Sequence, residues 1–134
     1  MGGTLAGNAL SLAAARATLE YVLTDDAFAR MTDLATQFVA GVNQALGDAG
    51  LKWTVSQLGA RAEYRYADPP PRTGSDSAAA ADTELDDFLH AFLANRGVLI
   101  TPFHNMALMC PATTGEDVDR HTEAFTAAVA ALTG

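Results

Sequence analysis

Residues 25–66 read DDAFARMTDLATQFVAGVNQALGDAGLKWTVSQLGARAEYRY, and the hydrophobic period of this stretch changes halfway along it. The first half repeats apolar side chains at the 3.6-residue spacing of a helix: Phe28, Met31, Leu34, Ala35, Phe38, Val42 and Leu46. The aspartate pair that opens it suits the positive end of a helix. The second half alternates apolar and polar residues on both sides of Gly59. We therefore predict a helix followed by an antiparallel hairpin.

Three further segments carry helical periodicity. The first, residues 9–23, follows Asn8, which is a preferred N-cap, and alanines cover most of its faces. Such a helix offers little polar surface, so more than one of its sides is expected to pack against other protein. The second spans 83–96 with Thr83 as its cap, and the last begins after a threonine cap at position 113 or 114.

Two short apolar runs, 98–100 and 107–109, predict two more strands. The order along the chain is then ααββαββα, in which no βαβ unit repeats. The predicted class is therefore α+β, with a small mixed or antiparallel sheet covered by helices. The length of 134 residues suits one domain, 1–134, and the turn-rich segment 67–83 is expected to be a surface loop excursion within it.

Charge and composition exclude several classes of protein. Sixteen acidic against eight basic residues give a net charge of -8, which repels phosphate backbones and anionic lipid surfaces, so neither nucleic acid nor membrane is expected as a partner. The apolar runs are too short to span a bilayer, and the N-terminus does not resemble a secretory signal. Together with the single cysteine, Cys110, these features favour a cytoplasmic location.

Few residues suggest chemistry on their own. The histidines at 90, 104 and 121 lack the paired spacing of a zinc site, so no metal is predicted. The single lysine, Lys52, lies in a polar turn that does not favour a Schiff base. The glycine–threonine turn at 2–4 could cradle an anion or be an ordinary chain start. The loop 102–106, which carries His104 and Asn105, could line a pocket or be a packed turn.

A longer pattern links these pieces. The run Gly3-Thr4-Leu5-Ala6-Gly7-Asn8-Ala9, followed by an alanine-rich helix that closes in Ala17-Thr18-Leu19-Glu20, resembles the GTxxGNP segment of class III pyridoxal-phosphate-dependent aminotransferases. Within that family it is most similar to the glutamate-1-semialdehyde aminomutase branch. The similarity continues through the hairpin, the loop 102–106 and the segment 114–118, and so covers essentially the whole chain.

The resemblance implies a fold and a role. The chain would be the C-terminal small domain of a longer fold-type I enzyme, with the large domain and the Schiff-base lysine upstream, and would be inactive alone. Gly3 and Thr4 would bind the phosphate of pyridoxal phosphate in the partner subunit of a homodimer. The enzyme would move amino groups between small molecules through the pyridoxamine form of the cofactor, with His104 and Asn105 as candidate substrate-lining residues.

Two alternatives remain open. Aminomutases carry a glutamate and a small residue where Asn105 and Met106 stand, so the resemblance does not separate an aminomutase from an aminotransferase. The second alternative comes from a different class of function, a stand-alone, non-catalytic dimerisation or interaction domain.

Overall fold

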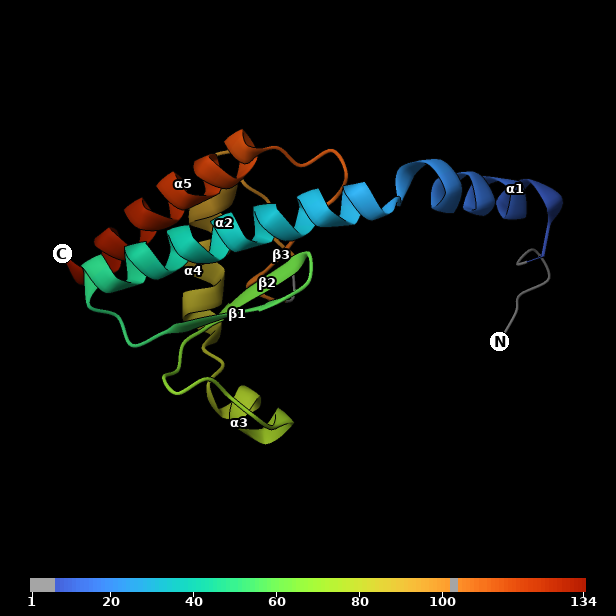
Figure 1. Cartoon of the computed structure of the whole chain (residues 1–134). Coiled ribbons are helices and arrows are strands. Elements are labelled where there is room, and N and C mark those ends of the chain that lie inside the picture. The colour runs from blue at the N-terminus through green and yellow to red at the C-terminus, as the bar shows by residue number, and fades with distance from the viewer. Residues whose placement is uncertain (1–6, 102–103) are drawn as a thin grey trace.

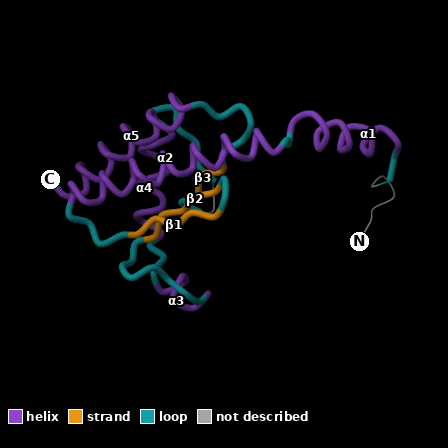
Figure 2. The backbone as a smooth tube through the Cα atoms, viewed as in Figure 1, coloured by secondary structure: helices purple, strands orange, loops and turns teal. Residues whose placement is uncertain are grey.

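The computed structural model describes residues 7–101 and 104–134. Along the chain lie α1 (Ala9–Ala17), a π-helical turn η1 (Thr18–Val22), α2 (Asp25–Ala49), β1 (Thr54–Leu58), β2 (Arg61–Arg65), α3 (Gly74–Ala79), α4 (Thr83–Ala94), β3 (Met106–Leu108) and α5 (Gly115–Thr133). Figure 1 shows α2, α4, α5 and the sheet gathered in one body, from which α1 projects. The tube in Figure 2 shows the same division.

The sheet is antiparallel, with the strand order β1-β2-β3. In its register Val55 lies opposite Tyr64, and Ala62 lies opposite Gln57 on one side and Ala107 on the other. Ala62 and Tyr64 are buried, whereas the alternate residues of β2 are not. One face of the sheet therefore packs on the helices, and the other presents Arg61, Glu63 and Arg65.

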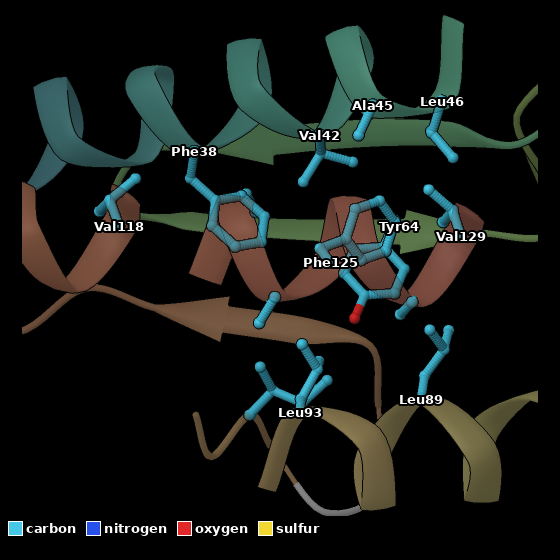
Figure 3. Packing of buried hydrophobic residues seen from close by; sticks show 14 residues of the cluster. Phe38, Val42, Ala45, Leu46, Tyr64, Leu89, Leu93, Val118, Phe125 and Val129 are labelled. Atoms are coloured by element: carbon cyan, nitrogen blue, oxygen red, sulfur yellow. The ribbon is translucent and has the colours of Figure 1, made fainter. Parts of the chain in front are cut away.

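Helices α2 and α5 run side by side in the same direction above the sheet (Figure 1). Their contacts advance in the same order along both helices. Gln37 Nε2 donates to Asp119 Oδ1 at 2.7 Å, and about one turn later Gly41 lies against Thr122. Helix α4 closes the core from the other side (Figure 3). Fully buried side chains from all these elements form that core: Phe38, Val42, Tyr64, Leu89, Leu93, Phe125 and Val129.

Most of the predicted elements are confirmed. Helix α2 ends at Gly50, whose φ of 67° is the left-handed C-cap conformation, and the hairpin turns at Gly59 with φ of 56°. Of the two caps considered for the last helix, Thr114 is the one used: Asp117 donates its backbone N–H to the Thr114 side chain, and the Asp117 carboxylate accepts from the Thr114 backbone N–H. The α+β class and the antiparallel sheet are confirmed as well.

Three predicted details are wrong. Residues 98–100 form no strand in the described structure. The backbone hydrogen bond to β3 comes from the next residue, Thr101, whose N donates to Met106 O at 3.2 Å. Residues 9–23 are not one regular helix, since a π-helical turn follows Ala17. The cap of α4 is Asp82, whose side chain accepts from Leu85 N, one residue before the expected Thr83.

The segment 67–83 contains a short helix that periodicity did not reveal. Helix α3 is capped by Thr73, whose side chain and backbone exchange hydrogen bonds with Asp76 in a capping box. None of its residues is buried, so the hydrogen bonds of the cap, rather than an apolar face, define it. Among the helices of the described residues, none is both long and apolar enough to cross a membrane.

We predict that Gly41→Ala destabilises the chain. A Cβ at position 41 would lie 2.5 Å from Thr122 Oγ1, so α2 and α5 would have to separate or Thr122 would have to rotate. Overpacking of this kind costs about 1–3 kcal/mol, which exceeds the gain of about 1 kcal/mol in helix propensity. Urea denaturation should show a lower free energy of unfolding.

Two variants control this experiment. Gly47→Ala lies in the same helix with open space around it, and it should be neutral or stabilising. Thr122→Ala should rescue the Gly41→Ala variant, because it removes the side chain that the new methyl group meets. A Gly41→Ala variant as stable as Gly47→Ala would show that the two helices are not in close contact here.

Candidate functional site

The candidate phosphate-binding residues, Gly3 and Thr4, lie outside the described residues. The helix that follows them begins as the sequence predicts: Asn8 Oδ1 accepts from Ser11 N at 2.9 Å, and Asn8 Nδ2 donates to Ser11 Oγ at 2.8 Å. The start of α1 thus presents backbone N–H groups that no carbonyl within the helix accepts, as a helix N-terminus does.

The segment 9–28, which we call the arm, carries several large apolar side chains that are exposed. None of the residues of α1 or η1 is buried, and Leu10 and Tyr21 retain 81% and 73% of their exposure. The other large apolar side chains of the arm that remain exposed are Leu12, Leu19, Val22 and Phe28. Figure 1 shows why: α1 extends away from the body and does not fold back on it. An apolar patch of this kind marks a surface that other protein covers.

His104 lies above the face of the sheet that the helices leave uncovered. Its Nδ1 is 3.3 Å from Glu63 Oε1, and Arg65 Nη2 is 2.8 Å from the same oxygen. Glu63 and Arg65 alternate along β2, so both side chains reach the face opposite the core. The Glu63 side chain retains only 17% of its exposure, whereas that of His104 retains 49%. The imidazole is therefore held on one side by a carboxylate and is open to solvent on the other.

Asn105 has the opposite environment, since it is only 3% exposed. Its Nδ2 donates to Tyr66 Oη at 2.9 Å and to Asp86 Oδ1 at 2.8 Å, and Tyr66 Oη donates to the same Asp86 oxygen at 2.6 Å. Burial, and then the hydrogen bond to Asp86, raise the pKa of Tyr66 far above its usual range, so the phenol stays protonated. The structure thus separates the two candidate substrate-lining residues into an exposed one and an internally bonded one.

Sequence analysis missed the partners of both residues. Glu63 and Arg65 are polar members of the alternating hairpin, and Asp86 is explained locally by its position in the first turn of α4. Nothing in the spacing of Tyr66, Asp86 and Asn105 along the chain links them, because the contact is made by tertiary packing. The one available signal was that Asn105 lies between two apolar segments, where an amide needs partners.

His121 is a buried histidine without a hydrogen-bond partner among the described residues. Its ring packs between Phe38, with ring centroids 4.3 Å apart, and Phe125, at 5.7 Å. Burial lowers the pKa of His121 from 6.5 to about 4, so the ring is neutral at pH 7. It borders a cavity of about 340 Å³ between α5 and residues 97–101 and 106–109, whose walls also include Ile100 and Arg120. Because both ring nitrogens are fully shielded, we assign this histidine to the core.

No group of three or more potential metal ligands gathers among the residues that the structure describes. Lys52 is exposed between α2 and β1, so its amine is fully solvated rather than poised for covalent chemistry. Cys110 is exposed, and a hydrogen bond from the Thr113 hydroxyl lowers the pKa of its thiol. The described part of the chain therefore offers an imidazole and a guanidinium at an exposed face, and it offers no desolvated amine.

Comparisons with known proteins show that this chain is similar to part of longer proteins. No family model matches it. It is 35% identical over 126 residues to a glutamate-1-semialdehyde 2,1-aminomutase of Thermus thermophilus, and 31% identical over 129 residues to that of Thermomicrobium roseum. These alignments cover 92% and 96% of this chain but only 29% and 30% of the relatives. The chain thus spans less than a third of the length of the curated relatives it matches.

Solved structures agree. A glutamate-1-semialdehyde aminomutase from Pseudomonas aeruginosa superposes with a TM-score of 0.94 at 48% identity, over 98% of this chain and 29% of that chain. A variant of it in complex with PMP gives 0.93 at the same identity. An omega-transaminase from Sphaerobacter thermophilus gives 0.83 at 25% identity, over the whole of this chain. In each case the matching region is the C-terminal part of the longer protein.

We predict that the chain loses stability in acid through His121. Its pKa is about 4 when folded and 6.5 as a free group, so the unfolded chain binds the extra proton between these values. The contribution is fully present above pH 6.5 and is lost as the pH falls toward 4, where the loss reaches about 3 kcal/mol. Urea denaturation from pH 7 to pH 4 should show this decline.

The control is His121→Leu, which removes the titrating group and keeps an apolar side chain of similar volume. Asp117 and Arg120, the charged neighbours of His121 on α5, and Tyr64, which faces it from β2, remain in both proteins, and so do the other carboxylates. The difference between the two pH profiles therefore isolates His121. Parallel profiles would contradict the assignment of a neutral, buried ring.

Proposed function

This chain is a homologue of the C-terminal part of the class III aminotransferases and glutamate-1-semialdehyde aminomutases, a pyridoxal-phosphate-dependent family, and we propose that it is the small domain of such an enzyme. The observation that carries the proposal is the superposition with a TM-score of 0.94 over 98% of the chain. A score this high requires the arm and the body to superpose together. The extended position of the arm is therefore a feature that this chain shares with the aminomutase structure.

The covalent chemistry is assigned to the part of the enzyme that lies outside this chain. The cofactor supplies an electron sink for amino transfer when it is held by a desolvated lysine. Lys52 is the only lysine here, and it is exposed at the start of the hairpin. This chain does not fit the role of cofactor anchor, so we propose that it is inactive alone.

The arm begins beside the residues that we propose touch the cofactor. Gly3 would allow the backbone to approach, and Thr4 would donate its hydroxyl and its backbone N–H to the cofactor phosphate in the partner subunit of a homodimer. Support comes from the Asn8 cap, which starts α1 four residues later and leaves the positive end of the helix facing that segment.

His104 and Asn105 form the second proposed contribution. His104 would face the amino donor or acceptor, because its ring is half exposed above the uncovered face of the sheet. Asn105 would border the same site through its backbone, since its side chain is bonded to Tyr66 and Asp86.

The alternative function, a stand-alone dimerisation or interaction domain, is favoured by one observation. The exposed apolar arm can pair with another copy of itself as well as with a large domain. The intact mass of the native gene product separates the two hypotheses. A mass well above 14.0 kDa supports the enzyme, and a mass of 14.0 kDa supports the interaction domain.

We predict that the purified chain, mixed with pyridoxal phosphate and an amino donor, gives no turnover. Its single lysine, Lys52, is exposed to solvent and is therefore not a desolvated amine of the kind that forms a stable Schiff base. Borohydride reduction followed by mass spectrometry should leave Lys52 no more labelled than the lysine of an unstructured peptide. The longer enzyme serves as the positive control, and sustained amino transfer by the chain alone would refute the proposal.

We also predict that the isolated chain self-associates through its arm. Sedimentation at rising concentration should show species heavier than a monomer, because the arm exposes six large apolar side chains. The double variant Leu10→Glu, Leu19→Glu should restore the monomer. Leu132→Glu, at the far end of α5, is the matched control and should leave association unchanged. If the chain remains a monomer at high concentration, the proposal that the arm is a surface for contact with other protein is contradicted.

A further inference from the structure

The segment 98–100 carries a strand signal that the sheet of this chain does not use. Its residues, VLI, form an apolar run of the kind that strands favour, yet the segment pairs with none of β1, β2 and β3. The backbone on both sides of it is tied to the body. Val98 N donates to Leu93 O at 3.0 Å, and Thr101 N donates to Met106 O at 3.2 Å.

The backbone between these two bonds is open. Among the described residues, the N–H groups of Leu99 and Ile100 and the carbonyl groups of 98–100 have no backbone hydrogen-bond partner. An unpaired backbone group is costly once other protein removes it from water, so a covered segment needs a partner for each such group. A run of strand-forming residues with an open backbone is therefore a template for one more strand.

The same segment lines the cavity of about 340 Å³ beside α5. The apolar walls of this cavity include Phe38 of α2, Met106 of β3 and Val118 of α5. Two leucines that also line it, Leu99 and Leu108, are 86% and 60% exposed. Protein interiors leave few voids larger than one water molecule, which takes about 30 Å³ in the liquid. The cavity thus has the size and the walls to receive apolar side chains that this chain does not supply.

The comparisons favour one occupant, the part of the longer protein that lies outside this chain. The chain spans 29% of the Pseudomonas aeruginosa aminomutase chain on which it superposes, and 98% of this chain takes part in the superposition. The course of the segment 98–100 is therefore shared with a protein in which more than two thirds of the chain is available to cover it. Because the segment belongs to the body, this contact is separate from any contact made by the arm.

We propose that residues 98–100 become a strand in the longer enzyme, by pairing with an extended segment from the part outside this chain, whose apolar side chains enter the cavity. The existence of that part rests on the proposed function. Main-chain hydrogen bonds along 98–100 hold the added segment, and the apolar walls of the cavity select its side chains, as in other cases of strand addition. The added segment also covers Leu99.

Amide hydrogen exchange, read residue by residue in the 134-residue chain and in the longer enzyme, tests the pairing. In the chain, the amides of Leu99 and Ile100 should exchange nearly as fast as those of an unstructured peptide. In the longer enzyme, one of the two should exchange about a hundredfold more slowly, as amides of a packed strand do. Only one is expected, because the backbone groups of a strand point alternately to its two edges. Val98, whose amide is bonded within the chain, is the internal reference.

Leu99→Asp tests whether the segment is covered. Leu99 is exposed in the chain, so the aspartate stays in water and the exchange pattern of the chain should not change. In the longer enzyme the carboxylate meets a covered apolar surface, so the slow amide should return to the rate measured in the chain. Leu132→Asp makes the same change at the far end of α5, away from the cavity, and should leave that amide slow. If Leu99→Asp does not fold, the comparison of the two wild-type proteins decides alone.

The outcomes separate this inference from the proposed function. If the longer enzyme transfers amino groups while Leu99 and Ile100 exchange as fast as in the chain, the strand pairing is overturned and the proposed function stands. If a longer protein without this activity slows one of the two amides, the pairing is supported and the proposed function fails. Protection that appears in the chain alone as its concentration rises assigns the occupant to a second copy, and this result also overturns the proposal.

Discussion

The close packing of α2 against α5 is the constraint on which the rest of the body depends. Gly41 brings the two helix axes near enough for Thr122 to fill the space where a Cβ would lie, and Phe38 packs its ring on His121 one turn earlier. The two helices run in the same direction and form one apolar surface. On it Tyr64 of β2 meets Phe125 of α5, with ring centroids 4.8 Å apart. The sheet and α4 pack on this surface (Figure 3).

The elements with strong periodicity could be predicted from sequence, and the elements fixed by tertiary contact could not. The helix of residues 25–49 and the hairpin around Gly59 carry their whole signal locally, in a buried stripe, glycine caps and alternation. The run 98–100 carries an equally good strand signal, yet its backbone is not in the sheet of β1, β2 and β3. Strand propensity describes a side chain's fit to a pleated surface and does not by itself place a backbone in a sheet.

The candidate site divides in the same way. The loop with His104 and Asn105 could be singled out because two polar side chains interrupt an apolar stretch, but their separate roles could not. Asn105 turns inward because Tyr66 and Asp86, which are 39 and 19 residues away in sequence, supply partners for its amide. His104 turns outward to a glutamate whose position on the uncovered face follows from alternation along β2. Sequence shows which residues need partners, and only the fold shows where the partners are.

The body buries most of its large apolar side chains, whereas the arm leaves its own exposed. In the body, the side chains of Phe38, Leu89, Leu93 and Phe125 are fully buried. Helices α4 and α5 begin at N-cap residues that lie directly before them in the chain. In the arm, large apolar side chains stand in solvent although the helix itself is well capped by Asn8. A helix that is locally complete but lacks a packed face has its stability supplied by something it docks against. On the uncovered face of the sheet, Arg65 pairs with Glu63 at 2.8 Å, and His104 Nδ1 lies 3.3 Å from the same carboxylate oxygen. Both features fit the proposal that this chain is one part of a longer enzyme whose remaining part supplies the missing contacts.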